Sequence, residues 1–258
     1  MFRPADVASA VHRMTTDPFR IGCAGWTIPK AHAASFPPSG SHLERYAQVF
    51  NAVEINSSFH RPHRRDTCER WASSVPEGFV FAVKAPKTIT HELRLVGAEA
   101  ELDEFLGQAG GLGKKLGPLL VQLPPKLGFD ADTVRAFLAA LRARHDGDVV
   151  CEPRHPDWFA ERADDLLAQF RIARVAADPA VVPAAAEPGG WQELAYIRLH
   201  GSPRVYWSDY APDQIDRFAE KLVRAAKDAR SAWCIFDNTA AGAATGNALA
   251  MRERVGSA

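Results

Sequence analysis

Residues that can transfer protons, bind anions or ligate metals lie at the ends of short apolar runs in this chain. They are Glu54, Asn56, Lys84, Gln122, Glu152, Arg154, Asp178, Arg198, His200, Asp237 and Asn238. Carboxylates and histidine suit acid–base chemistry, whereas lysine and arginine suit the binding of phosphate or carboxylate groups. If the runs end in one place, these side chains form a site for a small anionic molecule.

The apolar runs have the length of buried β-strands, and helical periodicity separates most of them. The runs cover residues 19–26, 50–59, 79–85, 118–123, 148–154, 173–178, 195–201 and 232–238. This alternation over 258 residues is typical of a single-domain α/β fold, the (β/α)8 barrel of the TIM type. In such barrels the carboxyl ends of the strands form the active site.

Side-chain alternation along the runs predicts which residues share the inner face. Side chains point to opposite faces in turn, so Glu54 and Asn56 share one face while Ile55 lies on the other. The same parity assigns Asp178 to the inner face and Val175 to the helix-facing side. One face therefore packs on helices, and the other converges on a polar interior.

The charge balance argues against a general affinity for polyanions. Lysine and arginine number 31, aspartate and glutamate also number 31, and the pI is about 7.1. No overall field attracts nucleic acid or anionic lipid, so the expected partner is a small anionic molecule. The loop 203–210 combines basic and aromatic residues, which leaves a nucleotide or single-stranded RNA open. The oligomeric state is also left open.

The cysteines and the N-terminal segment predict a cytoplasmic protein. Three of the four cysteines lie within predicted strands, where a thiol behaves as a small buried hydrophobe. The N-terminal segment has no sustained apolar stretch and predicts neither a secretory signal nor a membrane span. Residues 1–17 are expected to be an extension ahead of a barrel domain at 18–258.

The helical segments are clear except for the sixth. Ser41 and Glu44 have the spacing of a capping box, and 130–145 has a regular apolar stripe. Residues 88–94 predict a polar loop. The segment 179–191 is rich in Pro, Gly and Ala, which predicts a loop or short turn in place of the sixth helix.

The candidate site divides into proton-transfer groups and anion-binding groups. Glu152 and Asp178 are the carboxylates expected to move a proton, with His200 assisting near neutral pH. The cations expected to hold or stabilise the anion are Lys84, Arg154 and Arg198. The loops 200–202 and 238–242 place small residues and backbone amides where barrels commonly bind phosphate.

Several alternatives stay open at this point. The charged residues could form an internal salt-bridge lattice that serves packing alone. Lys84 could form an imine with a carbonyl substrate, a reaction of which lysine is capable. A divalent metal could bind the oxygen and imidazole ligands, although no compact ligand motif exists and the interleaved cations would repel it.

Motifs spread along the chain resemble the YecE-like family, which is catalogued as a domain of unknown function. They are IGCAGW at 21–26, HLERYAQVFNAVEINSSFHRP at 42–62, GFVFAVKAPKTITHELRL at 78–95, KLGPLLVQLPP at 115–125, CEPRHPDWF at 151–159, YIRLHGS at 196–202 and IFDNTAAGAATGNA at 235–248. The resemblance implies a TIM-type barrel but brings no established reaction. It adds Thr90, His91, His155 and Gly201 to the motif positions. The chain departs from the family pattern at His60 and within 27–36, which concerns substrate choice more than fold.

The sequence thus predicts a cytoplasmic, cofactor-independent enzyme that applies acid–base chemistry to a small phosphorylated or sugar-like anion. The expected catalytic residues are Glu152, Asp178, His200 and Lys84. Substrate binding is assigned to Glu54, Asn56, His91, Gln122, Arg154, Arg198, Gly201, Asp237 and Asn238. A metabolite- or nucleotide-binding protein without turnover and a metal-dependent phosphoester hydrolase are the alternatives.

Overall fold

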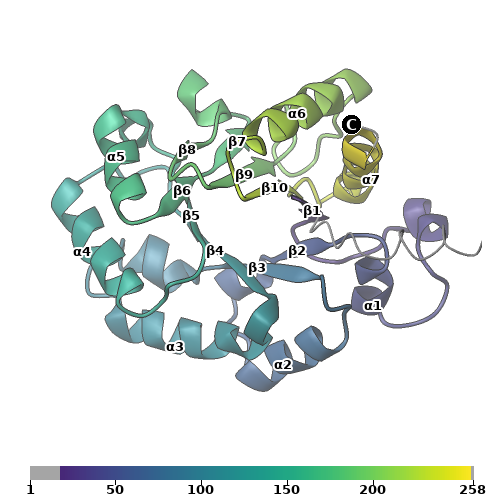
Figure 1. The fold of residues 1–258 in the computed structure, drawn as a ribbon, viewed down its shortest axis with the longest axis horizontal. Helices are drawn as coiled ribbons and strands as arrows, with labels where there is room; N and C mark the ends of the chain where they lie inside the picture. Colours follow the sequence, from purple (N-terminus) through teal and green to yellow (C-terminus); the bar gives the residue numbers. More distant parts are fainter. Residues whose placement is uncertain (1–17, 257–258) are drawn as a thin grey trace, which may run out of the picture.

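Parallel strands at the centre and helices outside them make up a single α/β domain (Figure 1). The computed structural model describes residues 18–256. Its strands are β1 (Phe19–Cys23), β2 (Ala52–Ile55), β3 (Val80–Lys84), β4 (Leu116–Gln122), β5 (Val149–Glu152), β6 (Ile172–Arg174), β7 (Ala176–Asp178), β8 (Gly189–Gly190), β9 (Leu194–Leu199) and β10 (Ser231–Phe236). Each of the eight predicted apolar runs overlaps one of these strands or, in the sixth run, the pair β6 and β7.

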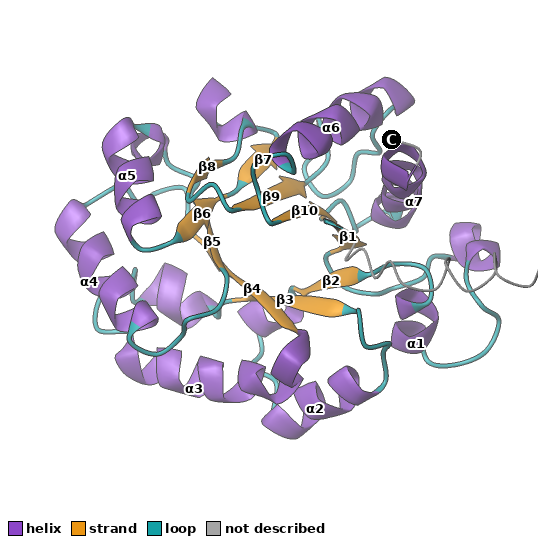
Figure 2. Cartoon of the chain, in the orientation of Figure 1, coloured by secondary structure: helices purple, strands orange, loops and turns teal. Residues whose placement is uncertain are grey.

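The strands form two sheets that face a common centre (Figure 2). The orders are β1-β10-β9-β7 and β2-β3-β4-β5-β6-β8, and every pairing is parallel except the antiparallel contact of β6 with β8. A single bridge between Ala24 and Glu54 links the first sheet to the second. At the other junction only Val175 separates β6 from β7. The parallel arrangement places the carboxyl ends of the strands on one side.

The α-helices cover the outer faces of both sheets (Figure 2). They are α1 (His42–Ala47), α2 (Arg65–Ser73), α3 (Glu99–Ala109), α4 (Ala131–Arg142), α5 (Glu161–Gln169), α6 (Pro212–Ala225) and α7 (Ala243–Gly256). The predicted capping box is present, since Ser41 Oγ accepts from the Glu44 amide and Glu44 Oε2 accepts from the Ser41 amide. The apolar stripe of α4 is buried as its periodicity predicts.

An apolar layer fills the space between the strands and lies below the candidate site. Its residues are Ala52, Ala82, Leu120, Val150, Ala173, Val175, Leu194, Tyr196, Trp233 and Ile235. Two positions further along β2, β3, β5 and β9, on the same face, come the buried Glu54, Lys84, Glu152 and Arg198. Strand parity therefore carries the side chains from an apolar floor to a polar layer at the carboxyl ends.

The irregular connections agree only in part with the sequence-based expectations. Residues 179–191 hold a 3-10 turn (Pro183–Ala186) and the short β8, so the expected irregularity is confirmed. Residues 88–94 were expected to be a polar loop, but Thr88–Glu92 form one π-helical turn. The turn buries Ile89 and Thr90, which gives it an apolar side that a solvated loop lacks.

The ends of the chain and the cysteines complete the description. The predicted extension at 1–17 lies outside the described residues. Within residues 18–256, no helix is long and apolar enough to cross a membrane. All four cysteines are buried and free, as their strand positions predict for three of them.

Candidate functional site

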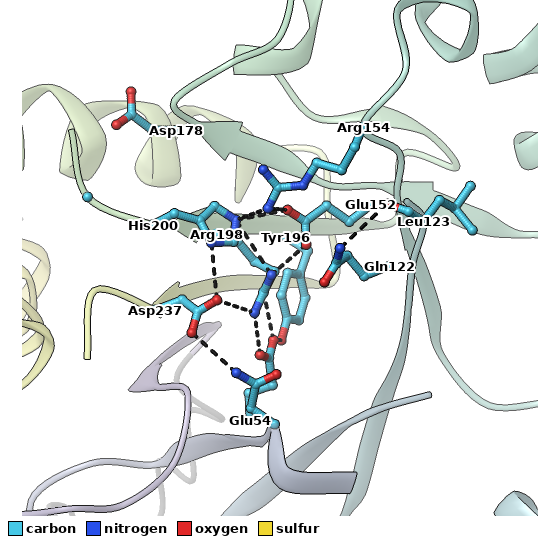
Figure 3. Close-up of polar contacts among 12 residues, drawn as sticks. Glu54, Gln122, Leu123, Glu152, Arg154, Asp178, Tyr196, Arg198, His200 and Asp237 are labelled. Carbon is cyan, nitrogen blue, oxygen red and sulfur yellow. Dashed lines mark hydrogen bonds and ion pairs between the residues drawn. The ribbon is translucent and has the colours of Figure 1, made fainter. Parts of the chain in front are cut away.

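Arg198 on β9 is the centre of the polar layer (Figure 3). Its Nε and Nη2 donate to the two oxygens of Glu54 at 3.0 and 2.6 Å. Its Nη1 donates to Glu152 Oε2 at 2.5 Å, and Nη2 also donates to Asp237 Oδ2 at 2.9 Å. The side chain is fully buried, and three carboxylates surround it. Arg198 therefore has no nitrogen left for a substrate, which corrects its predicted role as an anion holder.

Tyr196 completes this group, which we term the Arg198 cluster: Arg198, Tyr196, Glu54, Glu152 and Asp237. Tyr196 Oη donates to Glu54 Oε2 at 3.0 Å. Its ring stacks on Trp233 of the apolar layer, with the ring centroids 5.7 Å apart. Burial, and the Glu54 carboxylate beside it, raise the pKa of Tyr196 well above its ordinary value. The tyrosine therefore stays a neutral hydrogen-bond donor.

His200 lies between two carboxylates of the Arg198 cluster. Its Nε2 is 2.8 Å from Glu152 Oε1, and its Nδ1 is 3.1 Å from Asp237 Oδ2. Arg154 Nη2 lies 2.7 Å from the same Nε2. Protonated His200 can donate to both carboxylates, and neutral His200 with a proton on Nδ1 can accept from Arg154 at Nε2. Nε2 can therefore gain or lose a proton with a partner present in each state.

The neighbouring cations keep Glu152 ionised. Burial alone would raise the pKa of this carboxyl, but Arg198, Arg154 and His200 together hold the pKa well below its ordinary value. Arg154 Nη2 is 2.5 Å from Glu152 Oε1. Glu152 can therefore act as a base or as a fixed negative charge near neutral pH, whereas its role as an acid is disfavoured.

Asp237 links β10 to the end of β2. Burial raises its pKa, but Arg198 and His200 outweigh burial, and the pKa lies below the ordinary value. Asp237 Oδ1 accepts a hydrogen bond from Asn56 Nδ2 at 3.3 Å. Asn56 Oδ1 is buried without a partner, and so is Arg154 Nε. Buried polar atoms without partners are rare, so these two point to groups that a ligand could satisfy.

Lys84 lies beside the Arg198 cluster but forms no ion pair. Within residues 18–256, the contact of its Nζ is with the Phe59 ring, 4.3 Å from the centroid. The residue is only 6% exposed. Burial lowers the pKa of Lys84 and the charge of Arg198 lowers it further, while Glu54, Asp237 and Glu152 oppose the shift.

His91 contacts the same aromatic ring. The centroids of the His91 and Phe59 rings are 4.9 Å apart, in an edge-on contact. Thr90 Oγ1 is 2.8 Å from His91 Nδ1. Burial, Lys84 and His60 together lower the pKa of His91. We term Lys84, Phe59 and His91 the Lys84 rim.

Four predicted site residues lie outside the Arg198 cluster and the Lys84 rim. Gln122 is the last residue of β4, pairs with Glu152 of β5, and makes one long contact, Nε2 to Leu123 O at 3.5 Å. The Gly201 amide donates to Tyr210 Oη at 2.7 Å and is not free for phosphate. Asn238 donates to Ser208 O and Asn247 Oδ1, so its side chain points toward α7.

The fourth residue, Asp178, faces away from His200 and Glu152 (Figure 3). Its Oδ1 accepts from Tyr210 Oη at 2.8 Å. The predicted parity is inverted, because Val175 belongs to the inner apolar layer and Ala176 to the outer core. Asp178, two residues after Ala176, follows the outer parity. Its predicted role in proton transfer is therefore corrected.

Sequence reasoning missed Tyr196 and Phe59 as site residues. Tyr196 precedes Arg198 by two positions on the same strand face, so parity could have identified it. Phe59 lies in the turn after β2, where no periodic pattern applies. Tyr206, from the loop 203–210, packs edge-on against His200 with the ring centroids 5.9 Å apart.

The carboxylates of the site are paired with arginine and are not arranged as metal ligands within the described residues. Among the described residues, no group of three or more His, Cys, Asp or Glu side chains is arranged to hold a metal ion. The Arg198 guanidinium occupies the position between Glu54, Glu152 and Asp237. It supplies the positive charge that these carboxylates require.

Comparisons with known proteins identify relatives of the whole domain. The family model described as "Protein of unknown function DUF72" matches residues 20–258. The YecE protein of Escherichia coli K12 is 30% identical over 171 residues, and the match spans 64% of this chain and 61% of YecE. The YunF protein of Bacillus subtilis is 24% identical, with coverage of 90% of this chain and 93% of YunF.

Solved structures show the same fold. A DUF72 family protein of Enterococcus faecalis superposes with a TM-score of 0.78 at 21% identity, with coverage of 92% of this chain and 95% of that one. A DUF72 family protein of Thermotoga maritima gives a TM-score of 0.77 at 22% identity, with coverage of 92% and 99%. The chain therefore belongs to the DUF72 family.

Proposed function

We propose that this protein is a cofactor-independent enzyme, built as a (β/α)8 barrel, that applies acid–base chemistry to a small anionic substrate. Two contacts support the barrel. The Gly25 amide donates to Glu54 O at 2.9 Å beside the bridge that joins the sheets, and β6 runs into β7 across a single residue. A closed ring of strands would explain why residues from β2, β5, β9 and β10 meet in one cluster.

The observation that carries the proposal is a pair of under-satisfied cations beside a proton-transfer pair. Arg154 uses Nη2 to contact both Glu152 and His200, while its Nε is buried without a partner. Lys84 has no counter-ion among residues 18–256. A lattice present for packing alone would give Lys84 a carboxylate and Arg154 Nε an acceptor, because an unpaired buried charge or donor is costly. A phosphate or carboxylate bound by Lys84 and Arg154 would supply the missing partner.

The proton-transfer roles follow from the charges around His200. Glu152 stays ionised beside Arg198 and Arg154. His200 Nε2 carries the exchangeable proton, and Asp237 at Nδ1 fixes the orientation of the ring. The substrate would exchange a proton with His200 or Glu152 while the two cations hold its anionic group. A phosphorylated or sugar-like acid fits this division of roles.

A second candidate function is the capture of an anionic metabolite without turnover. Glu152 and His200 are fully enclosed in this structure, so neither is open to solvent. A catalytic role therefore requires the substrate to reach His200 past Arg154, whose side chain is 14% exposed. Binding to Lys84 and Arg154 alone requires no such approach.

Anion binding is tested by calorimetric titration of the full chain with inorganic phosphate. We expect Lys84→Met and Arg154→Met each to weaken phosphate binding by about tenfold, because each removes one charged donor. Lys126→Met, which changes an exposed lysine, is the matched control and should bind as the wild type does. Equal affinities for all four proteins would refute the anion site.

Turnover is tested separately. Wild-type protein and Glu152→Gln are incubated with a mixture of phosphorylated sugars and organic acids, and consumption is followed by mass spectrometry. Consumption by the wild type alone supports the enzyme. If phosphate binds to Lys84 and Arg154 but no compound is consumed, the binding function holds instead.

A further inference from the structure

We propose that the Lys84 amine forms a covalent imine with a carbonyl group of the substrate, which makes the substrate a carbonyl acid such as a 2-oxo acid. This inference rests on the proposed anion site and names its substrate class. Lys84 lacks the counter-ion that the other buried cations have, its Nζ lies against an aromatic ring, and one strand separates it from the strand that precedes Arg154.

Lys84 is the exception among the buried cations of the described chain. Arg198 has three carboxylates around it, and Arg174 pairs with both oxygens of Asp164 at 2.6 and 3.0 Å. Arg154 has Glu152 at 2.5 Å. Lys84 Nζ forms neither a hydrogen bond nor an ion pair with any of residues 18–256. A lysine kept as a permanent charge would be expected to have a carboxylate partner.

The surroundings of Nζ favour the neutral amine more than water does. The Phe59 ring lies on one side, and the residue is 6% exposed. Burial and the nearby Arg198 both disfavour the charged form. Lys84 Nζ has no hydrogen bond, yet it is not fully enclosed by protein, so it keeps some contact with solvent. The amine is therefore desolvated but open to a small molecule, as a lysine nucleophile requires.

The main chain fixes Lys84 at the mouth of the site. Ser58 Oγ donates to Lys84 O at 2.6 Å and to Ile55 O at 2.8 Å, which ties the end of β3 to the end of β2. Arg154 follows β5, and β4 is the one strand between β3 and β5. Strand spacing places roughly 10 Å between the two main chains, a gap that a substrate of a few carbons can span between the two side chains.

The chemistry balances with the groups present. The neutral Lys84 amine adds to the carbonyl carbon, and one proton passes from the nitrogen to the carbonyl oxygen to give a neutral carbinolamine with a lone pair on nitrogen. A second proton on that hydroxyl allows water to leave, and the nitrogen lone pair forms the C=N bond. His91 is suited to supply this proton, because Thr90 occupies its Nδ1, while its Nε2 makes no hydrogen bond within residues 18–256.

The imine then makes the adjacent carbon acidic. The protonated C=N bond accepts the electron pair released when a proton leaves that carbon, and His200 or Glu152 is the base. Return of a proton and addition of water restore the free amine and release the product. No external oxidant or reductant is needed.

The test is reductive trapping on the full-length chain. The wild type is incubated near pH 7 with cyanoborohydride and either glyoxylate or pyruvate, and labelled lysines are mapped by peptide mass spectrometry. The lowered pKa leaves a larger share of Lys84 than of the exposed Lys87 as neutral amine, so Lys84 should be labelled faster than Lys87. Propionaldehyde, which has no anionic group, should show a smaller preference for Lys84, because only the lowered pKa then favours this lysine.

Lys84→Arg separates the covalent step from anion binding. It keeps a cation at the site, so phosphate should still bind within about threefold of the wild type, while trapping at this position disappears. Lys84→Met should lose both. Lys84 and Lys87 are compared within one wild-type molecule, so the result does not depend on the folding of any variant.

Two outcomes overturn the imine. One is labelling of Lys84 no faster than that of Lys87 with either acid. The other is labelling of Lys84 that stays slower than labelling of Lys87 when the buffer contains no phosphate, which would otherwise compete for the site. If wild-type phosphate binding is intact in these cases, the imine fails and the anion site stands. Loss of wild-type phosphate binding would instead refute the proposed function itself.

Discussion

The Arg198 cluster and the Lys84 rim lie at the same end of the strands, yet they differ in how completely their charges are paired. Every nitrogen of Arg198 has a carboxylate oxygen within hydrogen-bond distance. Lys84 has an aromatic ring and no counter-ion among the described residues. The comparison shows that residue type alone does not identify which residues of this site bind a ligand. The unsatisfied cation is the better candidate for contact with a ligand.

The difference has a physical basis in the cost of burial. A buried charge is tolerated when oppositely charged groups surround it, and such a set is closed to other partners. Burial lowers the pKa of Arg198, but Glu152, Glu54 and Asp237 outweigh burial and raise it above the ordinary value. The pKa of Lys84 is lowered, because burial outweighs the nearby carboxylates. The first group should therefore control stability, and the second should control binding.

The largest effect is expected from Arg198→Met. The substitution leaves three carboxylates buried without their common cation, so the free energy of unfolding should fall by about 3–5 kcal/mol. Urea unfolding followed by circular dichroism measures the change. Arg64→Met removes an exposed pair with Asp66 and should change stability by less than about 0.5 kcal/mol.

If Arg198→Met were as stable as Arg64→Met, the two regions would not differ as we describe. The Arg198 cluster would then be dispensable for folding, and its charges would have to be explained by function instead. A large loss for Arg198→Met with little change for Lys84→Met would sharpen the comparison.

A smaller and pH-dependent effect is expected from Glu152→Gln. The folded-state pKa of Glu152 lies below its ordinary 4.5, so this carboxylate stabilises the fold above pH 4.5 and the contribution is lost as pH falls through the folded pKa. The variant should lose about 1–3 kcal/mol near pH 7 and approach the wild type at low pH.

The measurement is urea unfolding at a series of pH values. Glu77→Gln, at an exposed position, serves as the control and should follow the wild type throughout. A gap between Glu152→Gln and the wild type that stays constant from pH 7 to acid would contradict the charge-based account.

Strand order and much of the site follow from local patterns in the sequence. Period-two alternation in apolar runs identified the strands, and their parallel pairing brought Glu54, Glu152, Arg198 and His200 together as expected. Parity works where a run continues without a break, because each residue fixes the face of the next.

The failures occur where a run is interrupted or where a turn carries the residue. The sixth run breaks at Val175, and the parity of Asp178 relative to the cluster was therefore misjudged. Sequence also could not show that Arg198 is saturated, since pairing depends on contacts between strands far apart in the chain. Phe59 and the π-helical turn that carries His91 depend on the same kind of contact.

A further, smaller effect concerns His91. Protonation of this histidine adds a positive charge next to Lys84, so the binding of sulfate, which stays a dianion in this range, should strengthen as pH falls below the ordinary histidine pKa. His91→Gln should remove that pH dependence and weaken binding at pH 5.5 by about two- to fivefold. Titrations at pH 7.5 and 5.5 test this prediction. An equal pH dependence in the variant would place His91 outside the Lys84 rim.

The smallest effect is expected from Asp178→Asn. Asp178 accepts a hydrogen bond from Tyr210 Oη, which also accepts from the Gly201 amide, so the pair holds the loop after β9 in place. The variant keeps an acceptor oxygen at this position, and unfolding should change by less than about 1 kcal/mol. Phosphate affinity should stay within about twofold of the wild type, because Asp178 faces away from His200 and Glu152 (Figure 3) and pairs with Tyr210 instead. A tenfold change in phosphate affinity would show that Asp178 contributes to the anion site. A residue that is already paired would then control binding, which contradicts the comparison between paired and unpaired charges.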